Sequence, residues 1–145
     1  MISIKLIEKS DIHNLENIGK QSLPIYYDSS NLYHLLYDSN YILLKAVDEI
    51  NSVIGFVFSK IEDDNVHILS LAIIPNMRNK GIGTKLIDTL KNFKQFTSIT
   101  LNVLETNTNA INFYYKQNFK KIQVLYKYYS TLNNTNALFL KYTKL

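Results

Sequence analysis

Two glycines, Gly81 and Gly83, mark the point where a strand-like segment gives way to a helix-like segment. Residues 66 to 73 read as a strand, and apolar residues between Lys80 and Phe93 recur at helical spacing. Another strand-like segment follows at 98 to 104. A strand, a helix and a strand of this length form a right-handed crossover, so we expect the two strands to be parallel neighbours in one sheet.

The other segments predict strands and short helices. Turn-forming clusters at 48 to 51 and at 62 to 65 separate three consecutive strands, which favours an antiparallel meander. The expected strands are 2 to 7, 41 to 47, 52 to 61, 66 to 73, 98 to 104, 119 to 128 and 136 to 142. The expected helices run from Ser10 or Asp11 to Lys20, from Ser30 to Tyr37, from Lys80 to Phe93 and from Asn107 to Lys116. We see no repeat or linker, so we expect one domain over residues 1 to 145.

Composition excludes several classes of protein. The 145 residues are 46% hydrophobic, which is enough for the core of one domain. No run reaches the roughly 18 apolar residues of a membrane-spanning helix, and the first residues lack a secretory apolar stretch, so we expect a soluble protein in the cytoplasm or nucleus with no membrane partner. The absence of cysteine excludes cysteine-ligated metals, and we expect no metal. The net charge of +4 favours anionic ligands, but no block of like charges indicates a specific nucleic acid.

The glycine segment reads Arg78-Asn79-Lys80-Gly81-Ile82-Gly83 and precedes the first turn of the expected helix. A helix start exposes unpaired backbone N–H groups and the positive end of the helix dipole, and glycines let a diphosphate approach them. This chemistry suits a nucleotide-bearing cofactor. The segment is neither a Walker A loop nor a dinucleotide fingerprint. In the alternative interpretation, Gly81 and Gly83 only relieve crowding at a tight turn.

A second motif, Asn-x-x-Ala-Ile-x-x-Tyr-x-x-x-x-Phe, runs from Asn107 to Phe119. Together with the glycine segment, this motif resembles the GNAT superfamily of acetyl-CoA-dependent N-acetyltransferases. Within the superfamily the chain is most similar to protein N-terminal acetyltransferases, namely the NatE catalytic subunit and the ribosomal-protein alanine acetyltransferase. Asn118 stands where the family often has glycine.

The resemblance implies the α/β (α+β) GNAT fold, with a mixed sheet of about seven strands and about four helices. The sheet would be mostly antiparallel, with the strands at 66 to 73 and 98 to 104 as its parallel pair. The resemblance also implies acetyl-CoA as co-substrate, bound by backbone groups of the glycine segment and of the strand before it. The implied acetyl-CoA-binding residues are Leu71, Ala72, Ile73, Arg78, Asn79, Lys80, Gly81, Ile82, Gly83, Thr84, Asn107 and Tyr114.

Three residues are the catalytic candidates. Tyr114 matches the family tyrosine that stabilises the leaving thiolate, although an aromatic residue at helical spacing also fits a core position. His67 occupies the place of a catalytic tyrosine of the NatE subunit, and a histidine titrates near neutrality, so we expect it to act as the base. Asn102 stands where that subunit has a catalytic histidine, and asparagine can position water but cannot act as a base. A structural hydrogen bond is the alternative role for His67.

The expected acceptor is the α-amine of a protein N-terminus, attacked directly in a ternary complex. Near pH 7 roughly a tenth of such amines is neutral, against well under a thousandth of lysine side chains. By analogy with the family we expect Met followed by an apolar residue. The expected substrate-binding residues are Leu23, Pro24, Tyr27, Leu69, Tyr128 and Tyr129, and aromatic packing is the alternative role for the tyrosines.

Two other functions remain open from the sequence. The chain is compatible with a GNAT enzyme that acetylates a small amine, a polyamine or a lysine side chain. It is also compatible with a catalytically weak acetyl-CoA-binding or interaction subunit, because Asn102 replaces the family base. The expected partners are protein N-termini, with other acetyltransferase subunits or the ribosome as further candidates.

Overall fold

The computed structural model describes residues 1–129, 133 and 135–145. Two helices follow the first strand, three consecutive strands come next, and two short 3-10 turns precede α1 and α3. The elements are β1 (Ser3–Leu6), α1 (Ile12–Ser22), α2 (Ser29–Leu36), β2 (Tyr41–Val47), β3 (Val53–Glu62), β4 (Asn65–Ile73), α3 (Ile82–Lys91), β5 (Ser98–Leu104), α4 (Thr108–Lys116), β6 (Lys120–Tyr129) and β7 (Thr135–Thr143).

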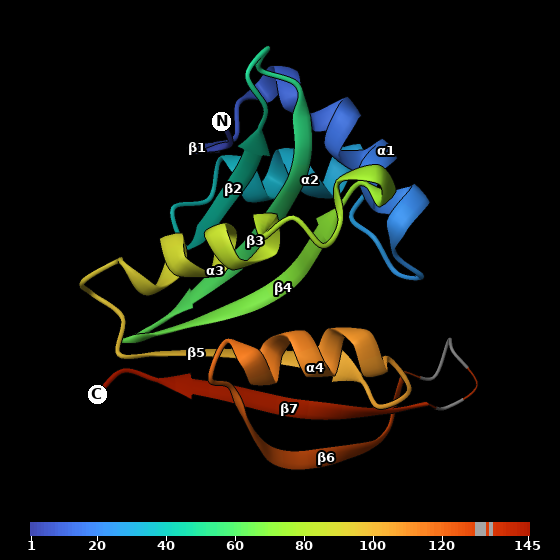
Figure 1. Cartoon of the computed structure of the whole chain (residues 1–145), viewed down its shortest axis with the longest axis vertical. Coiled ribbons are helices and arrows are strands. Elements are labelled where there is room, and N and C mark those ends of the chain that lie inside the picture. The colour runs from blue at the N-terminus through green and yellow to red at the C-terminus, as the bar shows by residue number, and fades with distance from the viewer. Residues whose placement is uncertain (130–132, 134) are drawn as a thin grey trace.

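In the described part of the chain, seven strands form one sheet in the order β1-β2-β3-β4-β5-β7-β6. All neighbours are antiparallel except β4 and β5, which the α3 crossover joins as a parallel pair. Figure 1 shows α3 and α4 on one face of the sheet and α1 and α2 on the other. The mixed sheet with one parallel pair and four flanking helices confirms the predicted fold.

Each face of the sheet carries a hydrophobic core. On one face, α3 buries Ile82, Leu86 and Leu90 against the central strands, as its helical periodicity predicts. On the other face, α1 buries Leu15 and Ile18 next to apolar side chains of β2 and β3. The cores hold the central strands rigidly between two helical layers, and this rigidity fixes the positions of side chains at the strand ends.

The parallel strands pair along only half of their length. Their ladder runs from Asn65–Ser98 to Ile68–Leu101 and stops there. At the same point β4 contains a bulge, where Leu69 has no partner on β3. Beyond the bulge the two strands diverge, as Figure 1 shows on the side away from the C-terminus. The divergence opens the sheet between β4 and β5.

Two helix starts differ from the sequence-based expectation. Asp28 caps α2 in place of Ser30, since its carboxylate accepts a hydrogen bond from the backbone N–H of Asn31 at 2.8 Å. The α3 helix begins at Ile82 and not at Lys80, because Gly81 takes the left-handed conformation with φ of 79°.

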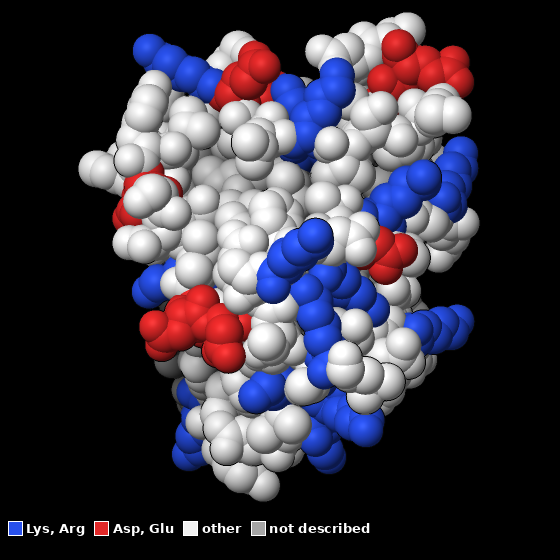
Figure 2. All heavy atoms as spheres, turned by 90° about the vertical axis from the view of Figure 1, so that its left-hand side faces the viewer, with Lys and Arg blue, Asp and Glu red and all other residues white. Residues whose placement is uncertain are grey.

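The surface mixes charges of both signs. On the side that Figure 2 shows, lysine and arginine side chains gather toward the lower part, and acidic side chains lie among them. No helix in the described residues is long and apolar enough to cross a bilayer.

Candidate active site

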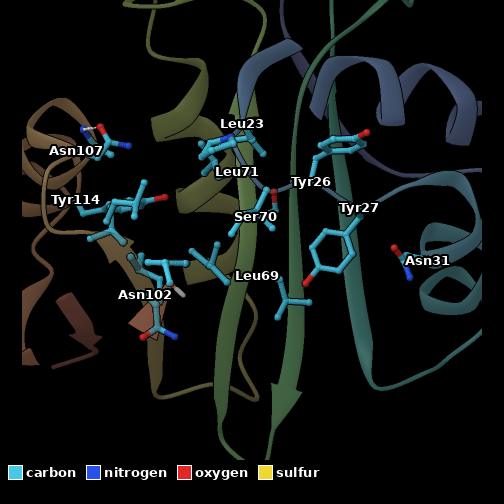
Figure 3. A pocket seen from close by; sticks show the side chains of 18 residues that line it. Leu23, Tyr26, Tyr27, Asn31, Leu69, Ser70, Leu71, Asn102, Asn107 and Tyr114 are labelled. Atoms are coloured by element: carbon cyan, nitrogen blue, oxygen red, sulfur yellow. Dashed lines mark hydrogen bonds between the residues drawn. The ribbon is translucent and has the colours of Figure 1, made fainter. Parts of the chain in front are cut away.

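The opening between β4 and β5 contains a cavity of about 390 Å³, which we call the first cavity. Its walls come from the second half of β4, the second half of β5, the loop between α1 and α2, the first turns of α4 and the end of β6 (Figure 3). The lining residues are Leu23, Pro24, Ile25, Tyr26, Tyr27, Asn31, Ile68, Leu69, Ser70, Leu71, Leu101, Asn102, Val103, Leu104, Asn107, Ala110, Tyr114 and Tyr129. None of them carries a charge.

A second cavity, of about 790 Å³, adjoins the first. It extends between the end of β4 and the start of α4 to the N-terminus of α3. The two cavities share Leu23, Leu71, Asn107, Ala110 and Tyr114 in their linings, so one continuous path leads from the glycine segment to the β4–β5 opening.

The N-terminus of α3 forms one end of the second cavity. The backbone N–H groups of the first turn, before Lys85, have no partner within the helix. The segment that leads into this turn contains two left-handed residues, Asn79 and Gly81. A Cβ atom added to Gly81 would meet nothing within 4 Å, so the space beside this residue is open. The geometry is that of an anion-binding helix start.

Gly83 and Arg78 have structural tasks in the same segment. A Cβ atom on Gly83 would lie 3.0 Å from the ring of Phe113, so this glycine lets α3 and α4 approach closely. The guanidinium of Arg78 donates from Nε to the backbone oxygen of Ile73 at 3.0 Å, which ties the segment back to β4. Gly83 therefore relieves crowding between two helices, as the alternative interpretation of the glycines expects. The space for an anion lies beside Gly81.

Tyr114 stands where the two cavities meet. Its side chain is 8% exposed and packs edge-on against Phe113 and Phe119. Figure 3 shows its hydroxyl directed into the cavity. Burial, with a smaller effect from Tyr129, raises the pKa of Tyr114, so the hydroxyl keeps its proton at neutral pH and can donate it in a hydrogen bond.

The α4 helix that carries Tyr114 starts and ends as the motif predicts. Asn107 caps it by accepting a hydrogen bond from the backbone N–H of Ala110 at 3.2 Å, which confirms the expected cap. At the other end Asn118 adopts a left-handed conformation with φ of 70°, which asparagine tolerates better than most residues. Asparagine therefore replaces the usual glycine without loss of the turn.

Asn102 presents an unsatisfied acceptor at the cavity. Its Nδ2 donates to the hydroxyl of Tyr128 at 3.2 Å. Its Oδ1 is buried and has no hydrogen-bond partner among the described residues. A buried carbonyl oxygen without a donor is uncommon, so an N–H or O–H group that reached this oxygen would be stabilised by it.

The expected acceptor-binding side chains gather around the first cavity. Leu23, Pro24, Tyr27, Leu69 and Tyr129 all line it, whereas Tyr128 reaches the site through its hydrogen bond to Asn102. In Figure 3 the hydroxyl of Tyr27 points toward Leu69, across the cavity from Tyr114.

The tyrosines of this wall are neutral donors. Burial first, then the neighbouring Tyr41 and Tyr128, raises the pKa of Tyr27. Burial and Tyr128 likewise raise the pKa of Tyr129. Their hydroxyls therefore stay protonated at neutral pH and remain available as hydrogen-bond donors and acceptors.

His67 lies outside both linings. Its Nδ1 is 2.8 Å from the hydroxyl oxygen of Thr100, and its ring stacks beside Phe139 at 6.5 Å. Burial, the largest effect, lowers the pKa of His67, Lys60 adds to the lowering and Glu62 opposes it. His67 nonetheless projects from the same sheet face as Asn102, because Thr100 is its partner in the ladder and Asn102 follows two residues later.

The second cavity includes all but one of the expected acetyl-CoA-binding residues. Lys80 is the exception, since its side chain does not line either cavity. Sequence reasoning missed several lining residues, among them Asn31, Ser70, Val103, Asn109 and Phe113. Ser70 and Val103 could have been predicted, because they adjoin predicted site residues on the two diverging strands. No pattern in the sequence indicated Asn31.

Comparisons with known proteins agree with this geometry. The sequence profile described as "Acetyltransferase (GNAT) family" matches residues 10–119. An N-alpha-acetyltransferase of Saccharolobus solfataricus is 31% identical over an alignment of 136 positions, which covers 83% of this chain and 81% of that protein. Ard1 from Thermoplasma volcanium superposes with a TM-score of 0.87 at 26% identity, covering 99% of this chain and 98% of its own. NAA60 of Arabidopsis thaliana, solved in complex with acetyl-CoA, has a TM-score of 0.84 at 23% identity and covers 99% and 98%.

Proposed function

The chain belongs to the GNAT family of acetyltransferases, and we propose that it transfers acetyl from acetyl-CoA to the α-amine of protein N-termini. The observation that carries this proposal is the junction of two cavities at Tyr114. One cavity ends at an anion-binding helix start, and the other is uncharged and contains the free acceptor atom of Asn102.

The residues of the second cavity fit acetyl-CoA. The N–H groups at the start of α3 suit its diphosphate, and the open space beside Gly81 leaves room for it. β3 pairs with one edge of Leu71, Ala72 and Ile73, and the β5 ladder ends before it reaches their other edge. Backbone groups on that second edge are open to the pantetheine arm, apart from the Ile73 oxygen, which accepts from Arg78. When bound, acetyl-CoA supplies the activated acetyl group as a thioester.

Tyr114 and Asn102 have separate roles in the transfer. The protonated hydroxyl of Tyr114 stabilises negative charge on the departing sulfur, since burial keeps this phenol neutral. The free Oδ1 of Asn102 accepts a hydrogen bond from the amine, or from a water molecule that the amine contacts. The amine attacks directly, with both substrates bound at the same time, because the two cavities adjoin.

The uncharged first cavity favours an α-amine over other amines. A polyamine needs carboxylates along its path, and no acidic residue lines this cavity. A lysine side chain needs a strong base, because its reference pKa is about 10.4, whereas that of an α-amine is about 7.7 to 8.0. Leu23, Pro24 and Leu69 form an apolar wall, which suits methionine as the first residue, followed by an apolar residue.

One relative supports the same acceptor class by its name. The Saccharolobus solfataricus protein is called an N-alpha-acetyltransferase. We extend this activity to the present chain as part of the proposal.

The test is an acetylation assay with a panel of acceptors. Purified protein is incubated with acetyl-CoA and peptides with free N-termini, an N-blocked lysine peptide or spermidine, and mass spectrometry locates any added acetyl group. We expect product on α-amines, best on peptides that begin with methionine and an apolar residue. Acetylated spermidine or lysine in place of this product contradicts the acceptor class, and acetyl-CoA binding without any product contradicts catalysis.

A matched pair of variants controls the assay. Tyr114→Phe removes the donor at the junction and should lower kcat by about tenfold or more while acetyl-CoA still binds. Tyr126→Phe removes an exposed hydroxyl elsewhere on the chain and should leave kcat unchanged.

A further inference from the structure

A chain of hydrogen bonds crosses the sheet beside the first cavity. Nδ2 of Asn65 donates to Oε1 of Glu62 at 3.2 Å and to Oγ1 of Thr100 at 2.9 Å. Oδ1 of Asn65 accepts from the hydroxyl of Ser98 at 2.7 Å. Thr100 continues the chain, because its Oγ1 lies 2.8 Å from Nδ1 of His67.

The direction of each hydrogen bond follows from the chemistry of the groups. The carboxylate of Glu62 only accepts, so the Asn65 atom beside it is the amide nitrogen. That nitrogen also donates to Thr100, whose hydroxyl therefore acts as acceptor toward Asn65 and keeps its one proton for another partner. Thr100 is 5% exposed, and Nδ1 of His67 is the acceptor that the described residues offer to its O–H group.

The two hydrogen bonds of the Thr100 hydroxyl assign the tautomer of His67. Nδ1 receives the Thr100 proton in a hydrogen bond, so neutral His67 carries its own proton on Nε2. The opposite tautomer would leave the buried Thr100 O–H without an acceptor, which is unfavourable. In the assigned tautomer Nε2 is a donor and has no lone pair with which to take a proton from an amine.

The ring of His67 lies outside the lining of the first cavity but on the same sheet face as Asn102, which lines it. His67, Thr100 and Asn102 project from one face of the sheet, and Phe139 lies directly opposite Asn102 on β7. His67 on β4 stacks beside Phe139 on β7, so side chains of these two strands are in contact on this face. His67 is only half-buried, so part of its side chain remains exposed to solvent.

We propose that Asn65 and Thr100 hold His67 as the tautomer protonated at Nε2, so that His67 binds the acceptor peptide as a hydrogen-bond donor and does not serve as the general base. The natural acceptor atom for this donor is a backbone carbonyl oxygen of the peptide. The proton that the amine loses goes to solvent water on the Asn102 side. The role toward a peptide rests on the proposed function, whereas the tautomer does not.

The charges around His67 agree with a neutral ring. Lys60 lies opposite His67 on β3, and Lys141 lies opposite Thr100 on β7, with Lys120 beside it on β6. Glu62 is the acidic group on this side, and its Oε1 is already bonded to Asn65. Burial is the largest effect and lowers the pKa of His67, Glu62 opposes the lowering, and Lys60 adds to it.

The first experiment reads the tautomer directly. The ¹⁵N chemical shifts of the two ring nitrogens report which one carries the proton, and the chain has only three histidines. The His67→Gln variant identifies the His67 signals by their loss. We expect the form protonated at Nε2 in the unmodified protein near pH 7.5, and a ring protonated at Nδ1 would overturn the proposal.

Variants of the chain of hydrogen bonds sharpen this readout. Thr100→Ser keeps the hydroxyl and should preserve the tautomer, whereas Thr100→Val removes it and should give a mixture of tautomers. The double variant Asn65→Asp with Glu62→Gln should reverse the tautomer, because Thr100 would then donate to the new carboxylate at position 65 and accept from Nδ1. An unchanged tautomer in the double variant, once it is shown to be folded, would contradict the assigned direction of the bonds.

The second experiment tests the role toward the peptide. His67→Gln retains a side-chain N–H donor and should keep the KM for the peptide within about threefold, whereas His67→Ala should raise it about tenfold. The kcat and its pH profile should change little in both variants. Loss of kcat together with loss of the acidic limb of the pH profile would identify His67 as the base and overturn the proposal. If no peptide is acetylated at all, the proposed function fails and the ¹⁵N shifts still decide the tautomer.

Discussion

Asn102 and Tyr128 are joined by a hydrogen bond of 3.2 Å from Nδ2 to the tyrosine hydroxyl, and this bond leaves Oδ1 of Asn102 buried without a donor. The two residues are 26 positions apart in sequence and come from β5 and the end of β6, two strands that β7 separates in the sheet. The relationship fixes the orientation of the amide, with its oxygen left free. The amide oxygen of Asn102 therefore lacks a hydrogen-bond donor among the described residues, and the N–H group of an amine is a donor of the required kind.

The first prediction concerns this acceptor. Asn102→Leu keeps the approximate volume and removes the amide, so kcat/KM for the peptide should fall by about 10- to 100-fold through the lost hydrogen bond to the amine. Steady-state kinetics measure this change. Acetyl-CoA affinity, measured by calorimetry, should stay within about threefold, because the glycine segment is elsewhere. An unchanged kcat/KM would show that Oδ1 takes no part in the reaction.

The second prediction separates backbone strain from ligand contact at Gly81. Gly81→Val places a branched residue at φ of 79°, which should cost about 1–2 kcal/mol of unfolding free energy and also weaken acetyl-CoA binding. Gly81→Asn should cost less stability, because asparagine tolerates this conformation, as Asn79 already does. Its side chain still enters the open space, so acetyl-CoA binding should weaken in this variant too. Denaturant unfolding and calorimetry give the two quantities, and normal binding by both variants would place the diphosphate elsewhere.

Much of this architecture could be predicted from the sequence because it depends on local patterns. Periodicity located the α3 crossover, two glycines marked its start, and the polar residue before Thr108 identified the cap of α4. The start of α2 was predicted at Ser30 and this was wrong, because Asp28 is the cap and its side chain can accept the same kind of hydrogen bond as a serine.

The features that depend on strand register could not be predicted. The bulge at Leu69 and the end of the β4–β5 ladder follow from pairing between distant segments. The contact of His67 with Thr100 depends on the same parallel register. Without knowledge of this register, His67 fits a catalytic base and a structural hydrogen bond equally well. The insertion of β7 between β5 and β6 likewise has no local signal.

The third prediction concerns the bulge that presents Tyr128. Leu125 pairs with Ala137 and Tyr129 with Thr135, so three β6 residues face the single residue Asn136. Within this bulge Lys127 has a positive φ of 52°. The backbone N–H of Lys127 donates to Oδ1 of Asn136 at 2.8 Å.

Asn136→Ala should therefore loosen the hairpin and raise the KM for the peptide by about three- to tenfold, with acetyl-CoA affinity unchanged. The matched control is Tyr126→Ala, because this bulge side chain is 78% exposed and should not affect the KM. An equal change in the KM for the peptide in both variants would mean that the hydrogen bond from Lys127 to Asn136 does not hold Tyr128 in place. Steady-state kinetics with varied peptide measure the difference.

The fourth prediction links stability to pH through His67. Its pKa in the folded protein is lowered by burial, so between the unfolded value of about 6.5 and the folded value the unfolded chain binds a proton that the native protein does not. Stability should therefore fall as the pH is lowered through this window, and be unaffected by His67 above it. Denaturant unfolding at several pH values should show a shallower acid-side loss in His67→Gln than in the unmodified protein. A steeper loss in the variant would reverse the sign of the shift.

Whether this GNAT acetyltransferase modifies α-amines can be decided with a single peptide. A peptide that begins with methionine and leucine and contains an internal lysine offers both amines to the same active site at the same concentration. After incubation with acetyl-CoA, tandem mass spectrometry assigns the acetyl group to one nitrogen. We expect acetylation of the N-terminal nitrogen, since the uncharged cavity lacks a base strong enough for lysine. Acetylation of the lysine side chain instead would overturn the proposed acceptor class.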